Sequence, residues 1–163
     1  MNAYHCFSLL LSGTILLGMK PKSAPEPPAM ATEIIGTMKV EGTKQGVISG
    51  SGNGAGSAWT NLTSFTQSTP IVVTKQTDPA SPKLFQAYNG HEQLKYVILQ
   101  LTKKLADGRQ VRDKIIKLTD VVISKINKKA SDLEEISFTY RTIQIQNVAA
   151  STSTADDWNT SGN

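Results

Sequence analysis

Cysteine and histidine are nearly absent from this chain of 163 residues, and their scarcity excludes several kinds of site. Cys6 is the single cysteine, so the chain can form neither an internal disulfide nor a zinc site built from cysteines. The two histidines, His5 and His91, are far apart in the sequence, and neither alone supports a metal cluster or a serine–histidine–aspartate set. We therefore expect no cofactor, no metal and no enzymatic activity.

Aromatic residues and excess charge are also scarce. Aromatic side chains make up 6% of the chain, and the formal net charge is +4. Proteins that bind nucleic acids usually gather their cations in a basic patch, often with an aromatic motif. Here the cations are spread along the predicted strands. We therefore expect no nucleic-acid partner.

A long apolar run occurs once, near the start of the chain. Phe7–Met19 is too short to span a bilayer comfortably, so we expect no stable membrane insertion. Its length suits the core of a secretory signal, and Ala29–Ala31 offers a small-x-small cleavage pattern. Against that interpretation, Lys20 and Lys22 follow the apolar run instead of preceding it.

A second explanation for the first residues is that translation starts at Met30. Residues 1–30 are then a misassigned or unstructured extension; in the first explanation they are a leader, with cleavage possible. Under either explanation, they stay outside the folded domain, which we place at 31–148. Residues 149–163 are rich in serine and threonine, and we expect them to form a flexible tail.

From Thr32 onward the sequence predicts a mainly β fold. Runs of β-branched and alternating apolar residues indicate strands at 33–41, 71–74, 94–102, 111–126 and 135–148, with a weaker one around 59–65. Asp107-Gly108 predicts a hairpin turn. The stretch 111–126 is either one long strand or two broken strands joined near Asp120.

One short helix is expected between Ser81 and Gly90. Ser81 is a good N-cap, and Pro82 suits the first helical position because its missing N–H costs nothing there. Gly90 stands where a helix would end. Asp78 is an alternative anchor, since aspartate side chains accept backbone N–H bonds in turns.

Two strands carry apolar residues on both faces. Leu94–Thr102 fits a strand buried on both sides, or one with a face against a neighbouring subunit. In the last strand the apolar residues change from even positions at 136–140 to odd positions at 143–145. A β-bulge or sharp bend near Arg141-Thr142 would explain the change. Alternatively, the two halves bury opposite faces, one against the core and one against a partner.

The segment from Lys75 to Phe85, K-x-T-D-x-x-S-P-K-L-F, resembles a signature of the haemolysin-coregulated (Hcp) tube proteins of type VI secretion. The matching positions are Lys75, Thr77, Asp78, Ser81, Pro82, Lys83 and Leu84. Met38–Gly42 resembles the end of the family's first strand, and Leu118–Ser124, which contains Asp120, resembles a later strand. A glycine-rich segment also lies where family members carry a variable glycine-rich loop; its glycines are Gly50, Gly52, Gly54 and Gly56.

This resemblance implies an Hcp-like β-barrel of two sheets with one short α-helix. It also implies hexameric rings that stack into the inner tube of a type VI secretion system and carry effectors. The partners would be further copies of the chain and the sheath, spike and effector proteins. Assembly would take place in the bacterial cytoplasm, followed by release. The alternative is a secreted β-barrel binding or adhesion module outside a contractile machine, which a cleaved leader would favour.

Stacking requires an extended element that reaches the next ring. The loop from Gly42 to Ala58 is our candidate, because its glycines make it mobile in isolation and its ordering on assembly would cost entropy. Polar contacts at the ring faces are expected from Lys44, Asp107, Arg109 and Lys129.

Overall fold

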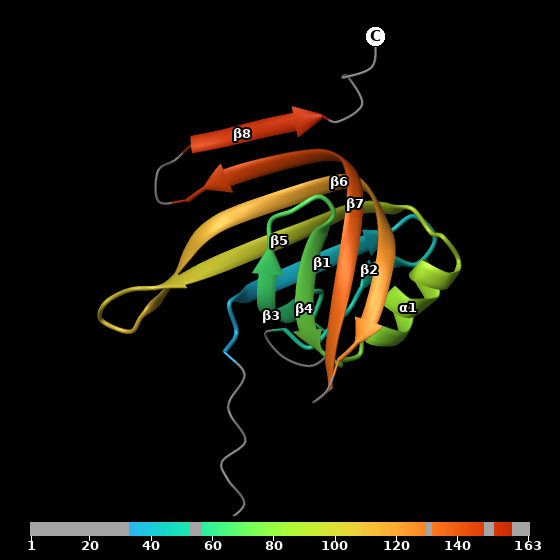
Figure 1. The fold of residues 1–163 in the computed structure, drawn as a ribbon, viewed down its shortest axis with the longest axis horizontal. Coiled ribbons are helices and arrows are strands. Elements are labelled where there is room, and N and C mark those ends of the chain that lie inside the picture. Colours follow the sequence, from blue (N-terminus) through green and yellow to red (C-terminus); the bar gives the residue numbers. More distant parts are fainter. Residues whose placement is uncertain (1–32, 53–56, 130–131, 149–151, 158–163) are drawn as a thin grey trace, which may run out of the picture. The chain divides into compact units, whose positions relative to one another are not determined.

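The computed structural model describes residues 33–52, 57–129, 132–148 and 152–157. The expected leader, Gly54 and Gly56 lie outside these residues. The elements in chain order are β1 (Gly36–Gly42), β2 (Gly46–Ile48), β3 (Thr60–Thr66), β4 (Ile71–Gln76), α1 (Ser81–Asn89), β5 (Leu94–Lys104), β6 (Gln110–Lys128), β7 (Leu133–Asn147) and β8 (Thr152–Asp157), as Figure 1 shows.

Antiparallel pairing runs through β1, β3, β4, β7, β6 and β5, and β5 pairs with β1 again to close a barrel. The short β2 adds to β1, and β8 adds to β7. The predicted mainly β barrel with one short helix is therefore confirmed. The expected two sheets are joined in one eight-stranded sheet, because the long strands β6 and β7 curve from one side of the barrel to the other (Figure 1).

Alternation along the strands fills the barrel. Met38 and Val40 in β1 and Ile71 and Val73 in β4 are buried, and their sequence neighbours are more exposed. Each such side chain contributes roughly 1.5–3 kcal/mol when it leaves water. The hydrophobic core lies inside the barrel, and Leu84 of α1 is part of it.

The helix begins and ends close to the predicted residues, but its N-terminus is built differently. Ala80 occupies the N-cap position and makes no side-chain cap bond, so the prediction of Ser81 as N-cap is wrong. Asp78 is the anchor instead, because its Oδ1 accepts the Ala80 N–H at 3.0 Å. Gly90 follows the last helical turn as expected.

In β5, Leu94, Val97 and Leu99 belong to the core and are fully buried. Tyr96 and Ile98 on the other face are half-buried. A single copy of the chain therefore does not bury this strand on both faces. Whether a neighbouring subunit covers the second face stays a prediction.

The change of parity in β7 is real, and β6 shares it. Ile143 pairs with the buried Leu118, and beyond the interruption Tyr140 pairs with the buried Val121. The pairing register is the same on both sides of the break, so no residue is inserted at Arg141-Thr142. Asp120, opposite Arg141, has a φ of 52°. The predicted bend is thus found (Figure 1), while the bulge between β6 and β7 lies further along, between Ile123 and Lys125.

The segments before β6 and after β7 test two further expectations, the hairpin turn and the flexible tail. Asp107-Gly108 forms the predicted turn: the Leu105 N–H bonds the Arg109 carbonyl at 2.8 Å, and Gly108 has a φ of 84°. β6 is one strand that continues through Asp120. The expectation of a flexible tail is wrong for residues 152–157, because β8 pairs with β7 along 142–147.

Candidate functional site

The alternation of β4 brings a lysine into the core. Ile71, Val73 and Lys75 share one face of the strand, and all three are fully buried. A buried ammonium group is stable only when anions and hydrogen-bond acceptors surround it. The residues around Lys75 are therefore the candidate site.

Lys75 Nζ contacts four oxygen atoms. It forms ion pairs with Asp78 Oδ1 at 2.8 Å and Glu134 Oε2 at 3.1 Å. It also donates to Ser81 Oγ and to the Gln76 carbonyl, each at 2.8 Å. We call Lys75, Asp78, Ser81 and Glu134 the Lys75 cluster. It joins β4, the start of α1 and β7 inside the protein.

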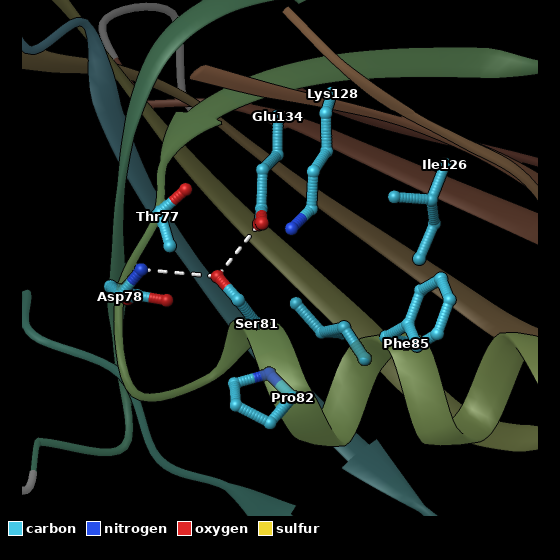
Figure 2. A pocket seen from close by; sticks show the side chains of 9 residues that line it. Thr77, Asp78, Ser81, Pro82, Phe85, Ile126, Lys128 and Glu134 are labelled. Atoms are coloured by element: carbon cyan, nitrogen blue, oxygen red, sulfur yellow. Dashed lines mark hydrogen bonds between the residues drawn. The ribbon is translucent and has the colours of Figure 1, made fainter. Parts of the chain in front are cut away.

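Ser81 lies at the centre of this cluster. Its Oγ donates to Glu134 Oε2 at 2.6 Å and accepts from the Asp78 N–H at 3.0 Å (Figure 2). A serine beside a lysine can be a nucleophile when a neutral amine removes its proton. Here Lys75 Nζ is fully engaged: it lies between two carboxylates and also contacts Ser81 Oγ and the Gln76 carbonyl.

Glu134 is a poor acceptor for the proton of the Ser81 hydroxyl. Burial raises the pKa of its carboxyl group, but the Ser81 hydrogen bond and the charge of Lys75 outweigh burial, so the net shift is downward. A carboxylate with a lowered pKa is a weak base near neutral pH. The cluster is therefore built to hold charges in place.

Asp78 also reaches the glycine-rich loop. Its Oδ2 accepts from the Ser51 N–H at 3.1 Å and from Thr60 Oγ1 at 3.2 Å. A Cβ atom at position 50 would lie 2.0 Å from Thr60 Oγ1 and 2.8 Å from Asp78 Oδ2. Glycine is needed at position 50 for close approach.

This packing corrects one expectation about the loop. The Gly50 N–H bonds the Ser57 carbonyl and the Gly52 N–H bonds the Trp59 carbonyl, both at 2.7 Å. Mobility is therefore not what these two glycines provide. They let two chain segments lie against each other where side chains would collide.

Gly42 has a similar internal role. A Cβ atom there would lie 2.4 Å from Glu92 Oε1. The buried Glu92 carboxylate accepts the N–H groups of Lys44 and Gln45 at 2.7 and 3.1 Å, and Gln45 Nε2 at 3.0 Å. Burial raises the pKa of Glu92, but these donors outweigh burial and lower it overall. Glu92 thus fixes the turn between β1 and β2.

A groove of about 490 Å³ opens beside the Lys75 cluster (Figure 2). Its apolar wall includes Pro82 and Phe85 of α1 and Ile126 of β6, and Lys128 and Glu134 lie on its polar side. The remaining lining residues are Thr77, Asp78, Ser81 and Leu84.

Residues 31–146 of the chain match the family described as "Type VI secretion system effector, Hcp". The chain belongs to the Hcp family. A curated Hcp-family relative, the major exported protein of Pseudomonas aeruginosa, is 34% identical over 100 residues. That match covers 55% of this chain, which spans little more than half, 58%, of the relative's length.

One solved Hcp structure supports the same membership, and a second supports the fold. The secreted protein Hcp3 of Pseudomonas aeruginosa has a TM-score of 0.68 at 30% identity, covering 76% of this chain and 99% of that one. The Hcp1 protein of Escherichia coli EAEC 042 has a TM-score of 0.66 at 21% identity, covering 77% and 99%. The second likeness concerns the fold alone.

The structure gathers most of the Hcp-like signature around the Lys75 cluster. Lys75, Thr77, Asp78, Ser81 and Pro82 come together around the cluster and its groove. Thr77 donates its N–H and its Oγ1 to the Asp132 carbonyl, at 2.7 and 3.1 Å, which ties the turn after β4 to the residue before β7.

Three other predicted residues have separate positions. Leu84 is buried beneath the groove, and Lys83 is exposed on α1, where its carbonyl accepts Gln45 Nε2 at 3.1 Å. Asp120 lies away from the cluster, with its Oδ1 accepting Gln93 Nε2 at 3.3 Å.

Sequence reasoning missed Glu134 and Glu92. The inward parity of Lys75 in β4 calls for a buried anion, but the sequence does not identify one that is 59 residues away. Among the residues that the structure describes, no three His, Cys, Asp or Glu side chains are grouped to hold a metal ion. No helix in that part of the chain is long and apolar enough to cross a membrane.

Proposed function

We propose that this Hcp-family chain is a structural tube subunit of a type VI secretion system. In this proposal it forms hexameric rings that stack into an inner tube and carry effectors. The observation that carries the proposal is the use of the family signature: the side chains of Lys75, Asp78 and Ser81 are taken up by internal contacts that join β4, α1, β7 and the glycine-rich loop. A signature used in this way favours a building block over a catalyst.

The electrostatics of the cluster also favour a protein that is not an enzyme. Ser81 Oγ lies beside Lys75 Nζ and Glu134, but the lowered pKa of Glu134 makes its carboxylate a poor base for activating the hydroxyl. The proposed partners are further copies of this chain and the sheath, spike and effector proteins. Assembly in the bacterial cytoplasm and release through the secretion system follow from the same proposal.

Ring closure needs two different faces on each subunit, because a closed ring is built from heterologous contacts. The outer face of β5 offers one candidate, with the half-buried Tyr96 and Ile98. Val122 on β6 and Val47 on β2 are further apolar side chains that remain 38% exposed.

Electron microscopy and light scattering of the purified full chain test this proposal. Six-fold rings or tubes are expected, with a mass six times that of one chain for a single ring. A monodisperse monomer at high concentration would contradict the tube function and favour the secreted binding module. N-terminal sequencing of the native protein would then show whether a leader had been removed.

A further inference from the structure

Asp78 faces two parts of the protein at once. Its Oδ1 accepts Lys75 Nζ at 2.8 Å and the Ala80 N–H at 3.0 Å, inside the Lys75 cluster. Its Oδ2 points the other way and accepts donors from Ser51 and Thr60. We call Gly50, Ser51 and Thr60 the loop base. One carboxylate therefore connects the loop base to the rigid interior.

The loop base is shaped around this carboxylate. Ser51 presents its N–H and its hydroxyl to Oδ2, at 3.1 and 3.4 Å, and Thr60 presents its hydroxyl at 3.2 Å. Thr60 is 3% exposed, and Asp78's side chain is 5% exposed. Hydrogen bonds to a shielded carboxylate are charge-assisted and are about twice as strong as neutral ones.

We propose that Asp78 is the positioning residue for ring stacking: it holds the loop base in the orientation from which the loop meets the next ring. The inference rests on the proposed tube function and on the sequence-based expectation that the loop from Gly42 to Ala58 is the stacking element. Without the carboxylate, the loop base gains conformational freedom that stacking must remove again. Each backbone residue that is newly ordered costs about 1–2 kcal/mol, so releasing one or more residues weakens stacking by about tenfold or more.

Asp78→Asn alone is an incomplete test, because it also removes a charge beside the buried Lys75. Thr60→Val and Ser51→Ala avoid that problem: each removes a donor from Oδ2 and leaves all contacts of Lys75 intact. Thr63→Val is the matched control. It lies on the same strand, receives the same substitution and loses one hydrogen bond, to the Thr74 carbonyl.

Amide hydrogen exchange of the full chain gives the first measurement. In the Ser51→Ala/Thr60→Val double variant, exchange of the Gly50 and Gly52 N–H groups is expected to accelerate at least tenfold. Exchange of the Leu84 N–H, which bonds the Ala80 carbonyl in α1, should remain unchanged. Unaltered exchange at Gly50 and Gly52 would overturn the role of Asp78.

The ratio of stacked to single rings, from sedimentation and electron microscopy, is the second measurement. The double variant is expected to keep six-fold rings, with a stacking constant about tenfold lower, while Thr63→Val stacks normally. Normal stacking by the double variant would refute the positioning role and leave the tube function intact. An unaltered protein that forms no rings would refute both. A purely structural role would lower thermal stability without changing this ratio in rings that remain folded.

Discussion

Two groups of ion pairs in this protein have similar distances and very different surroundings. In the Lys75 cluster, Lys75 Nζ lies 3.1 Å from Glu134 Oε2, and the two side chains are 0% and 6% exposed. Near the tip of the β5–β6 hairpin, Lys103 Nζ lies 3.0 Å from Asp113 Oδ1, and those side chains are 48% and 36% exposed. The two pairs have nearly the same N–O distance and differ in burial, so comparing them isolates the effect of burial.

Water accounts for the difference in what the two pairs contribute. An exposed pair is hydrated with or without its partner, so it contributes about 0–1 kcal/mol. A buried charge has lost its water, and deleting its partner leaves it uncompensated at a cost of about 3–5 kcal/mol. We therefore expect substitutions in the two regions to differ by several-fold.

The largest effect is expected from Lys75→Met. The variant leaves the carboxylates of Asp78 and Glu134 next to each other without a cation, and we expect it to lower the free energy of unfolding by about 3–5 kcal/mol. Lys103→Met should lower it by less than about 1 kcal/mol. Denaturant unfolding measures both values. Equal effects would mean that burial does not govern these pairs.

The contrast between buried and exposed side chains can also be tested with uncharged residues, on two neighbours in α1. Leu84 is 1% exposed and Phe85 is 50% exposed. Leu84→Ala creates a core cavity, and we expect it to cost about 2–5 kcal/mol. Phe85→Ala removes a larger side chain but should cost less than about 1.5 kcal/mol. A larger loss for Phe85→Ala in denaturant unfolding would reverse the predicted order.

Acid should weaken the Lys75 cluster selectively. The pKa of Glu134 is lower in the folded protein than its ordinary value of 4.5, so the unfolded chain binds the proton more readily. Its contribution to stability is therefore complete above about pH 4.5 and is lost as the pH falls through the lowered value. Glu134→Gln should flatten the pH dependence of unfolding in this acidic range. An unchanged slope would assign the acid sensitivity to other groups.

The smallest effect is expected at the hairpin tip. Asp107 is ion-paired with Arg109 at 2.7 Å, and the N–H groups of Arg109 lower its pKa, but both side chains lie in solvent. Asp107→Asn should leave the unfolding midpoint unchanged within error, at pH 7 and in acid. A clear shift would show that this exposed pair behaves like the buried one.

Much of the barrel was predictable from local pattern, because each strand buries alternate residues. Ile71, Val73 and the helix signals at Pro82 and Gly90 are examples. The segment 152–157 has no such alternation, and its strand exists because β7 offers a free edge. Tertiary pairing of this kind leaves no trace in the paired segment itself.

The candidate site was only partly predictable, for a related reason. Its signature residues were recognised from 75–84, but Ser81 was expected to cap the helix. The carboxylate that accepts its hydroxyl, Glu134, comes from β7, far along the chain. From composition alone, Gly50 and Gly52 likewise predict a loop with high conformational freedom. What they provide is room for Trp59 and Thr60, which no local rule reveals.

β1 has seven residues and three partner strands. Detaching it would uncover the edges of β3 and β5 together and turn a closed barrel into an open sheet. Unpaired strand edges are templates for pairing with other molecules. A bulky fusion placed directly before Gly36 would therefore invite aggregation, and a purification tag is better attached well upstream of this strand.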